Sequence, residues 1–196
     1  MIRLKNIADI FSGYTFRERL GAFQAGNTVV VQMKNIDAND CLQVDDVTLV
    51  NLPDLNERQL LRQGDLLLRA RGLFHTAAVV AQVPERTIVA APLMVIRLKS
   101  PKMQPAYLRW FLNQQGTQAQ LVKLAAGSHV KTLSKVVLEE LDIPLPPLDR
   151  QSYIAEISEL GARERALVLL IAEKRSRALE CKLIHSAVQN ARQESR

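Results

Sequence analysis

The stretch Ile143-Pro144-Leu145-Pro146-Pro147-Leu148-Asp149 divides the chain into two parts of different character. Three prolines in four positions fit neither a helix nor a central strand, so the backbone is expected to be extended there. Asp149 would then cap the following element, because its carboxylate can accept from the first free N–H groups of a helix. We therefore predict one domain over residues 1–149 and a second element over residues 150–196.

The part after this boundary is predicted to be one helix over residues 150–192, because it contains neither proline nor strand-like alternation. A heptad seam starting at Tyr153 is apolar at eight of its eleven positions, which is typical of a coiled coil. Such a helix reaches on the order of 60 Å, whereas a domain of about 150 residues has a radius of gyration of only about 15 Å. Its apolar stripe therefore needs a partner helix, although a helix that folds back over its own domain stays an alternative. The predicted dimer interface consists of Tyr153, Ile157, Leu160, Leu167, Ile171, Ala178, Cys181 and Val188.

The part before the boundary shows short mixed elements. Runs rich in Val, Ile and Leu predict strands over residues 29–34, 47–51, 65–70, 77–83 and 93–99. Helices are predicted over residues 105–114, 117–125 and 134–138, with Pro105 suited to a first turn. Many non-local strands combined with a few helices indicate an α+β domain.

The charge is unevenly distributed along the chain, although the net charge is only +6. Residues 37–57 contain six acidic residues and no basic one, whereas residues 58–135 contain twelve Lys and Arg and only two acidic residues. A surface with one dominant sign favours a polyanionic partner. A solvated basic face without a ligand remains the plainer alternative.

Three segments combine glycine with hydrogen-bond donors, the combination that lets a loop approach DNA closely and contact bases and phosphates. They are residues 12–19, 69–76 and 126–132. The candidate DNA-binding residues are Tyr14, Arg17, Arg19, Arg69, Arg71, His75, Lys123, Ser128, His129 and Lys131.

Motifs for catalysis are missing from the sequence. Glu180-Cys181-Lys182 has the letters of a nuclease motif but falls inside the predicted coiled coil, and Leu145-Pro146-Pro147-Leu148 lacks the flanking residues of a DNA methylation site. Neither a phosphate-binding loop nor a nucleophile with an evident histidine partner occurs. We expect no catalytic residue, no cofactor and no metal.

The cellular compartment follows from what the chain lacks. No run of about 18 apolar residues occurs, so no membrane contact is expected. The N-terminus lacks the apolar core of a secretion signal, and two cysteines 140 positions apart do not indicate a disulfide framework. We predict a cytoplasmic protein.

The order of several motifs resembles that of a known family. Residues 4–13, Leu-Lys-Asn-Ile-Ala-Asp-Ile-Phe-Ser-Gly, open the chain, and Gly64-Asp65-Leu66-Leu67 follows. Pro105-Ala106-Tyr107-Leu108 then starts a helix, and the series closes with the proline-rich stretch and Arg150-Gln151. Across essentially the whole chain this resembles the specificity subunit of type I restriction–modification enzymes. Arg150 departs from the family's usual Glu, which we expect to alter local capping and not function.

The resemblance implies a non-catalytic target-recognition domain followed by a spacer helix. Family members usually carry two such units with antiparallel helices, so one unit implies a half-size subunit that forms a homodimer and recognises a symmetric, interrupted double-stranded DNA target. The family's methyltransferase and restriction subunits would supply the chemistry. Two alternatives stay open: a coiled-coil scaffold with an incidental basic surface, and an unrecognised enzyme that uses Asp65 with Arg69 and Arg71.

Overall fold

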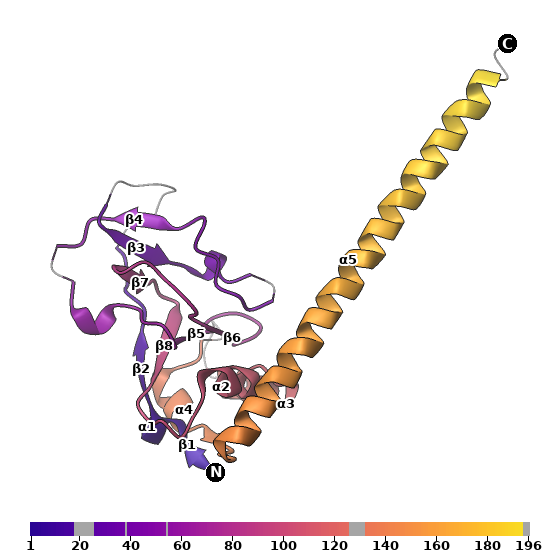
Figure 1. The fold of residues 1–196 in the computed structure, drawn as a ribbon. Helices are drawn as coiled ribbons and strands as arrows, with labels where there is room; N and C mark the ends of the chain where they lie inside the picture. Colours follow the sequence, from indigo (N-terminus) through magenta and orange to yellow (C-terminus); the bar gives the residue numbers. More distant parts are fainter. Residues whose placement is uncertain (18–25, 38, 54, 126–131, 194–196) are drawn as a thin grey trace. The chain divides into compact units, whose positions relative to one another are not determined.

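The computed structural model describes residues 1–17, 26–37, 39–53, 55–125 and 132–193, with side chains up to residue 185 (Figure 1). It divides into two compact units, Met1–Ile154 and Ala155–Arg196. The first unit mixes strands and helices and the second is entirely helical, so the predicted α+β class is confirmed.

A four-stranded antiparallel sheet forms the centre of the first unit. Its order is β2 (Ala8–Ser12), β8 (Leu93–Leu98), β5 (Leu66–Arg69) and β6 (Ala77–Val79). All three leucines at positions 66–68 of β5 are fully buried, because the sheet is covered on both faces. Leu66 and Leu68 pack into one apolar cluster and Leu67 into another, which explains why β5 shows no alternation in sequence.

A smaller sheet consists of β4 (Thr48–Val50), β3 (Thr28–Val31) and β7 (Thr87–Val89). β3 is antiparallel to β4 and parallel to β7. Two short 3-10 helices, η1 (Met33–Asn35) and η2 (Glu57–Gln59), lie in the connections. Figure 1 shows this sheet near the end of β2 that is far from the N-terminus.

Four short helices and a two-stranded pair complete the first unit. The helices are α1 (Leu4–Ile7), α2 (Pro105–Leu112), α3 (Gln115–Ala125) and α4 (Lys135–Glu139), and β1 (Ile2–Arg3) pairs with β9 (Asp142–Ile143). Buried leucines from α2, α3 and α4 join the cluster that covers one face of the large sheet. The Tyr107 hydroxyl donates to the carbonyl of Pro144 at 3.1 Å, and burial raises the pKa of Tyr107.

The long helix α5 (Leu148–Gln193) confirms the predicted continuous helix. It begins at Leu148, so the expectation that Asp149 precedes the helix as its N-cap was wrong, and Asp149 lies inside the first turn. Gln151 is fully buried, and its amide donates to the carbonyls of Lys102 and Pro146, each at 2.8 Å. These contacts, with the packing of Ile154, join the first turns of α5 to the first unit.

Several predicted elements differ from those observed. The strand predicted over residues 29–34 ends at Val31, because the side chains of Gln32 and Asn35 form a reciprocal cap around η1. The strand predicted over residues 77–83 ends at Val79, because its neighbour turns at Gly64, whose φ of 87° lies in the left-handed region. The sequence did not predict β1, β2, β7 or β9.

Candidate nucleic-acid interface

Described residues of the three glycine-containing segments lie at one end of the large sheet: Ser12 of the first, residues 69–71 of the second and Thr132, the last residue of the third. Ser12, the last residue of β2, is paired with Met94, and Met94 is paired on its other side with Leu68 of β5. The connection after β5 is joined in turn to Thr132, because Arg71 forms an antiparallel bridge with Thr132 and the N–H of the next residue, Leu133, donates to the carbonyl of Ala70 at 2.7 Å. Neighbouring strands lie about 4.8 Å apart, so segments distant in sequence share one small surface.

The connection between β5 and β6, residues 70–76, forms the most exposed part of this surface. Arg71 is exposed and forms an antiparallel bridge with Thr132. Gly72 has a φ of 135°, a conformation that L side chains rarely adopt, so glycine is required there. Leu73 and Phe74 follow and are 73% and 63% exposed. We name residues 71–74 the hairpin tip.

Arg69 is held inside the domain and does not project from it. Its guanidinium donates to the carboxylate of Asp40 at 2.8 Å and to the hydroxyl of Thr76 at 2.7 Å. It also donates to the carbonyls of Ile36 and Asp37, at 2.8 and 2.9 Å. Arg69 therefore ties the start of the hairpin connection to the loop that follows η1.

Asp37 completes the same loop. Burial raises the pKa of its carboxyl, but donors from the Cys41 backbone, the Gln43 side chain and the Asn39 backbone, with the charge of Arg69, bring that pKa below its usual value. The three donors lie 2.8 to 3.0 Å from the carboxylate oxygens. The ionised form of Asp37 thus stabilises the support beneath the hairpin connection.

His75 is fully buried beneath the hairpin tip. Its Nδ1 lies 2.9 Å from the Arg69 carbonyl, an arrangement that requires the proton on Nδ1. Its Nε2 has no hydrogen-bond partner within the described part of the chain. The backbone of His75 is bonded on both sides by the Gln118 side chain from α3. His75 thus lies where it can support the tip and not where it can touch a large ligand.

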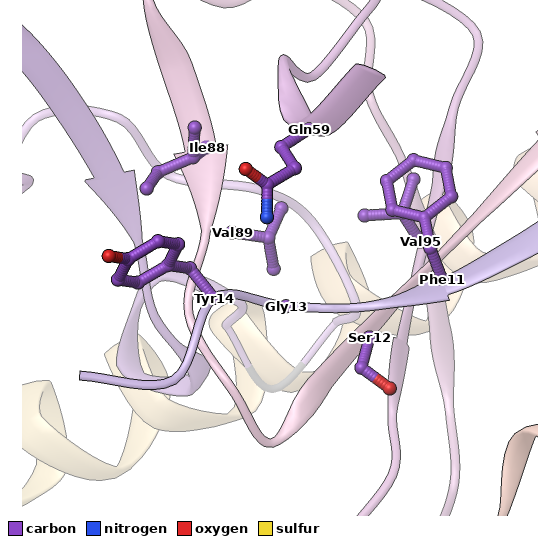
Figure 2. A pocket seen from close by; sticks show the side chains of 8 residues that line it. All are labelled: Phe11, Ser12, Gly13, Tyr14, Gln59, Ile88, Val89 and Val95. Carbon is purple, nitrogen blue, oxygen red and sulfur yellow. The ribbon is translucent and has the colours of Figure 1, made fainter. Parts of the chain in front are cut away.

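Tyr14 and Arg17 occupy the segment that follows β2. Tyr14 N–H donates to the carbonyl of Val89 at 2.7 Å, and its ring lies 4.7 Å from that of Phe16. Figure 2 shows Tyr14 and Phe11 on either side of Gly13, with the Gln59 amide between them. The cavity that they line has a volume of about 10 Å³, which is room for a single water. Arg17 is exposed, whereas Arg19 lies outside the described residues.

Gly13 allows the segment after β2 to cross the end of β7 at close range. A Cβ atom on residue 13 would lie 2.6 Å from the carbonyl carbon of Ala90 and 2.8 Å from the nitrogen of Ala91. No side chain fits there without a backbone shift, so glycine is needed for the close approach. The crossing places Tyr14 beside the smaller sheet, where its N–H bonds Val89 of β7.

The third segment is described only at its edges. Lys123 is exposed near the end of α3, the helix that holds His75 through Gln118. Ser128, His129 and Lys131 lie outside the described residues. Among the predicted DNA-binding residues, those exposed in the described part are therefore Arg17, Arg71 and Lys123.

A basic groove that the sequence did not indicate runs along β2, the edge strand of the large sheet. Its volume is about 810 Å³, and Ser12 connects it with the end of the sheet described above. The charged side chains that line it are Lys5, Arg58, Arg62, Arg97, Lys99, Lys135, Asp9 and Glu139. Six basic and two acidic side chains thus line this groove.

Ion pairs engage only some of these cations. Lys99 lies 3.0 Å from Asp9, and Arg97 binds the buried carboxylate of Asp65 at 2.6 Å. Lys5 is paired with Glu140 and Lys135 with Glu139, so four of the six cations are engaged. Arg58 and Arg62 are exposed and take part in none of the ion pairs between described residues. They are therefore available to an anionic ligand.

Asp65 is not arranged as a catalytic group. It is buried, accepts from Arg97 Nε at 2.8 Å and from the backbone N–H of Arg62 at 2.8 Å, and lies at the opposite end of β5 from Arg69. Within the described ranges no cluster of three or more His, Cys, Asp or Glu is placed to hold a metal ion. Of the helices described, none is long and apolar enough to cross a membrane.

The helix α5 exposes the predicted seam. Tyr153, Ile157, Leu160, Leu167 and Ile171 are each between 50% and 60% exposed. Ala178 and Cys181 are exposed as well, and the side chain of Val188 lies outside the described ones. Leu169, Leu179 and Leu183 add further exposed apolar surface to the same helix. This amount of uncovered apolar surface is unusual for a helix in water.

Comparisons with known proteins match the fold. A family model described as the type I restriction modification DNA specificity domain matches residues 1–159. The HsdS subunit from Thermoanaerobacter tengcongensis has a TM-score of 0.64 at 20% identity, over 86% of this chain and 38% of that one. A structure concerned with complex assembly and conformational transition of the type I R-M system has a TM-score of 0.63 at 20% identity, over 88% and 41%.

A third structure, the type I restriction–modification S subunit from M. genitalium, has a TM-score of 0.54 at 16% identity, over 89% of this chain and 42% of that one. Comparison with curated proteins gives no match. The chain thus spans about two fifths of the length of the solved structures that it resembles. At these identities the structural likeness shows the fold.

Proposed function

The chain belongs to the family of the type I restriction modification DNA specificity domain, and on that premise we propose that it directs partner subunits to a double-stranded DNA sequence. In this proposal the chain itself catalyses no reaction. Methyltransferase and restriction subunits supply the chemistry, and the compartment is the cytoplasm.

The observation that carries the proposal is that Ser12, residues 69–71 and Thr132 lie together at one end of the large sheet, from which a basic groove runs along β2. Arg71 is exposed there, at the bridge to Thr132, and Arg17 and Lys123 are further exposed donors of the same unit. Arginine can bind guanine through two hydrogen bonds, whereas contacts to phosphates fix the position of the protein on the duplex. We assign base contacts to Arg71 and phosphate contacts to Lys123 and to Arg58 and Arg62 of the groove.

Arg69 and His75 have a supporting role in this proposal. Four hydrogen bonds fix the guanidinium of Arg69, and His75 is fully buried. Both residues keep the connection between β5 and β6 in one conformation. A contact loop that is already ordered loses less conformational entropy on binding.

The exposed seam of α5 supports a homodimer. A second copy of α5 packed antiparallel would bury Leu167 and Ile171 near the dyad, together with Leu160 and Ala178 on either side. One recognition unit would then lie at each end, and the DNA target would consist of two symmetric half-sites separated by a gap. Glu164 and Lys174, polar residues in the seam, would fix the register and orientation.

The test is a selection of duplexes from a random-sequence library by the full chain, alone and with a type I methyltransferase subunit. A single enriched motif is expected, bipartite and symmetric if the dimer forms, with affinity falling linearly in log salt. If no sequence is enriched, either by the chain alone or with the methyltransferase subunit, the proposal is wrong. A dimer that binds no DNA would instead favour the scaffold alternative.

A further inference from the structure

The hairpin tip presents two large apolar side chains that the described part of the chain does not cover. Leu73 and Phe74 are 73% and 63% exposed, although they follow the fully buried leucines of β5 by only a few residues. Isolated exposed leucines are common, but an adjacent pair with a large aromatic ring at the end of a hairpin is a candidate contact surface.

This tip is rigid at its base. The Gln118 side chain bonds both the N–H and the carbonyl of His75, at 2.8 and 3.0 Å. On the other side, Leu133 N–H donates to the carbonyl of Ala70 at 2.7 Å. With both stems fixed, Leu73 and Phe74 project into solvent as a preformed wedge.

The chemistry around the wedge favours an anionic partner. The hairpin contains no acidic residue, and the Asp40 carboxylate at its base is paired with Arg69, whereas Arg71 is exposed next to the wedge in sequence and in none of the ion pairs between described residues. The two side chains offer on the order of 300 Å² of apolar surface, well below the roughly 800 Å² that each partner buries in a stable protein complex. An apolar wedge of this size next to arginine suits a step between two base pairs.

We propose that Leu73 and Phe74 insert between adjacent base pairs of the bound DNA while Arg71 contacts the flanking backbone or base edge. The inference rests on the proposed function and specifies how the duplex is deformed. Insertion replaces the stacking of one base on its neighbour by stacking on a side chain, and it kinks the duplex. Pyrimidine–purine steps unstack most easily, so a TA or CA step is the expected place.

The experiment uses the full chain and the duplex enriched by the selection described above, with 2-aminopurine replacing each adenine in turn. This base fluoresces more strongly when it is unstacked, so wild type should raise the fluorescence at one step of each half-site and at no other. Phe74→Ala combined with Leu73→Ala should abolish that rise and weaken binding about tenfold. Phe74→Trp should keep the rise, and Val136→Ala, which alters an exposed apolar residue on α4, should change neither quantity.

The outcomes separate this inference from the function on which it rests. If no duplex is enriched, both proposals fail. If a motif is enriched but the fluorescence rises at no 2-aminopurine position, the insertion of Leu73 and Phe74 is disproved while DNA recognition stands. A contact of the two side chains with thymine methyl groups would give this result. If the double alanine variant binds and unstacks DNA like wild type but no longer binds the methyltransferase subunit, the tip contacts protein and the inference fails.

Discussion

Gln118 and His75 are joined by a two-point contact between a side chain and a backbone. The Gln118 Oε1 accepts from His75 N–H at 2.8 Å, and its Nε2 donates to the His75 carbonyl at 3.0 Å. The amide thus pairs with the backbone as a neighbouring strand would, across 43 residues of sequence. It connects α3 with the connection between β5 and β6.

Removing this amide should loosen the hairpin connection. Gln118→Ala leaves the buried backbone groups of His75 without partners, so the free energy of unfolding should fall by about 2–4 kcal/mol. Urea denaturation measures the loss, and amide hydrogen exchange at His75 should accelerate. Gln120→Ala, at an exposed position of the same helix, is the matched control and should change neither. If Gln118→Ala and Gln120→Ala have equal free energies of unfolding, the contact between Gln118 and His75 does not stabilise the fold.

Substitution of Arg71 should change DNA binding, whereas substitution of Arg69 should change the stability of the fold. Arg71→Ala should leave the urea midpoint unchanged and relax the preference for one base pair, at a cost of about 1–3 kcal/mol in binding. Arg69→Ala should instead lower stability, because it removes four hydrogen bonds and leaves Asp40 without its cation. Denaturation and repeated sequence selection measure the two effects. An unchanged motif with Arg71→Ala would disprove the base contact.

The basic groove should contribute to the salt dependence of DNA binding. Each of Arg58→Ala and Arg62→Ala should reduce the slope of log affinity against log salt by about 0.9, since one phosphate contact is lost. Lys123→Ala should weaken binding to all sequences about equally. The slope is measured by fluorescence anisotropy with labelled duplexes between low and high salt. Arg163→Ala on α5, an exposed arginine outside the groove, should leave the slope as it is.

Ile171→Asp should dissociate the proposed dimer. An antiparallel arrangement brings the two copies of residue 171 close to the dyad, so two carboxylates would be buried near one another. Sedimentation equilibrium should give a dimer for wild type and a monomer for the variant, with unchanged near-ultraviolet circular dichroism from the first unit. Ser176→Asp, on the opposite face of the helix, should remain dimeric.

Two results would count against this arrangement in different ways. A wild-type chain that is monomeric at tens of micromolar would exclude the dimer. Cross-linking that joins the two copies of residue 157 to each other would replace the antiparallel geometry with a parallel one and leave the stoichiometry intact.

The carboxyl of Asp37 should make stability depend on pH. Its pKa in the folded state lies below the ordinary 3.8, so its contribution is present at neutral pH and is lost as pH falls through the folded pKa. Asp37→Asn should cost about 1 kcal/mol or less at pH 7, because the group is partly exposed to solvent. Urea denaturation should show that the difference in the free energy of unfolding between wild type and Asp37→Asn becomes smaller from about pH 5 downward. Asp45→Asn, which alters an exposed carboxylate, serves as the control.

Local patterns were sufficient to predict the long helix and most helices of the first unit. The proline-rich stretch marks the start of α5, and Ser134 caps α4 as a serine before a helix usually does, accepting from Val137 N–H at 3.3 Å. By contrast, β1 and β9 have two residues each and exist only because they pair with one another. Strand β2 was missed because its partner β8 is about 90 residues away in sequence.

The sequence predicted which segments belong to the candidate interface but not how their side chains are arranged in space. Glycine and arginine drew attention to residues 69–76, yet the sequence does not show that Asp40 and Gln118 bind inside that segment. The basic groove escaped prediction because Lys5, Arg58 and Lys135 come from three distant elements that only the tertiary fold brings together. Charge counted along the sequence gave the sign of the surface and not its location.

The pairing of β1 with β9 has a consequence for how such a domain can be exchanged between proteins. Ile2 is aligned with Ile143, and Arg3 with Asp142, so the first unit enters and leaves through adjacent strands about 5 Å apart. Replacement of everything between these strands would alter the hairpin tip and the groove together and leave the sequence of α5 unchanged. Under the proposed function, such an exchange would change the binding preference without any redesign of the helix that follows.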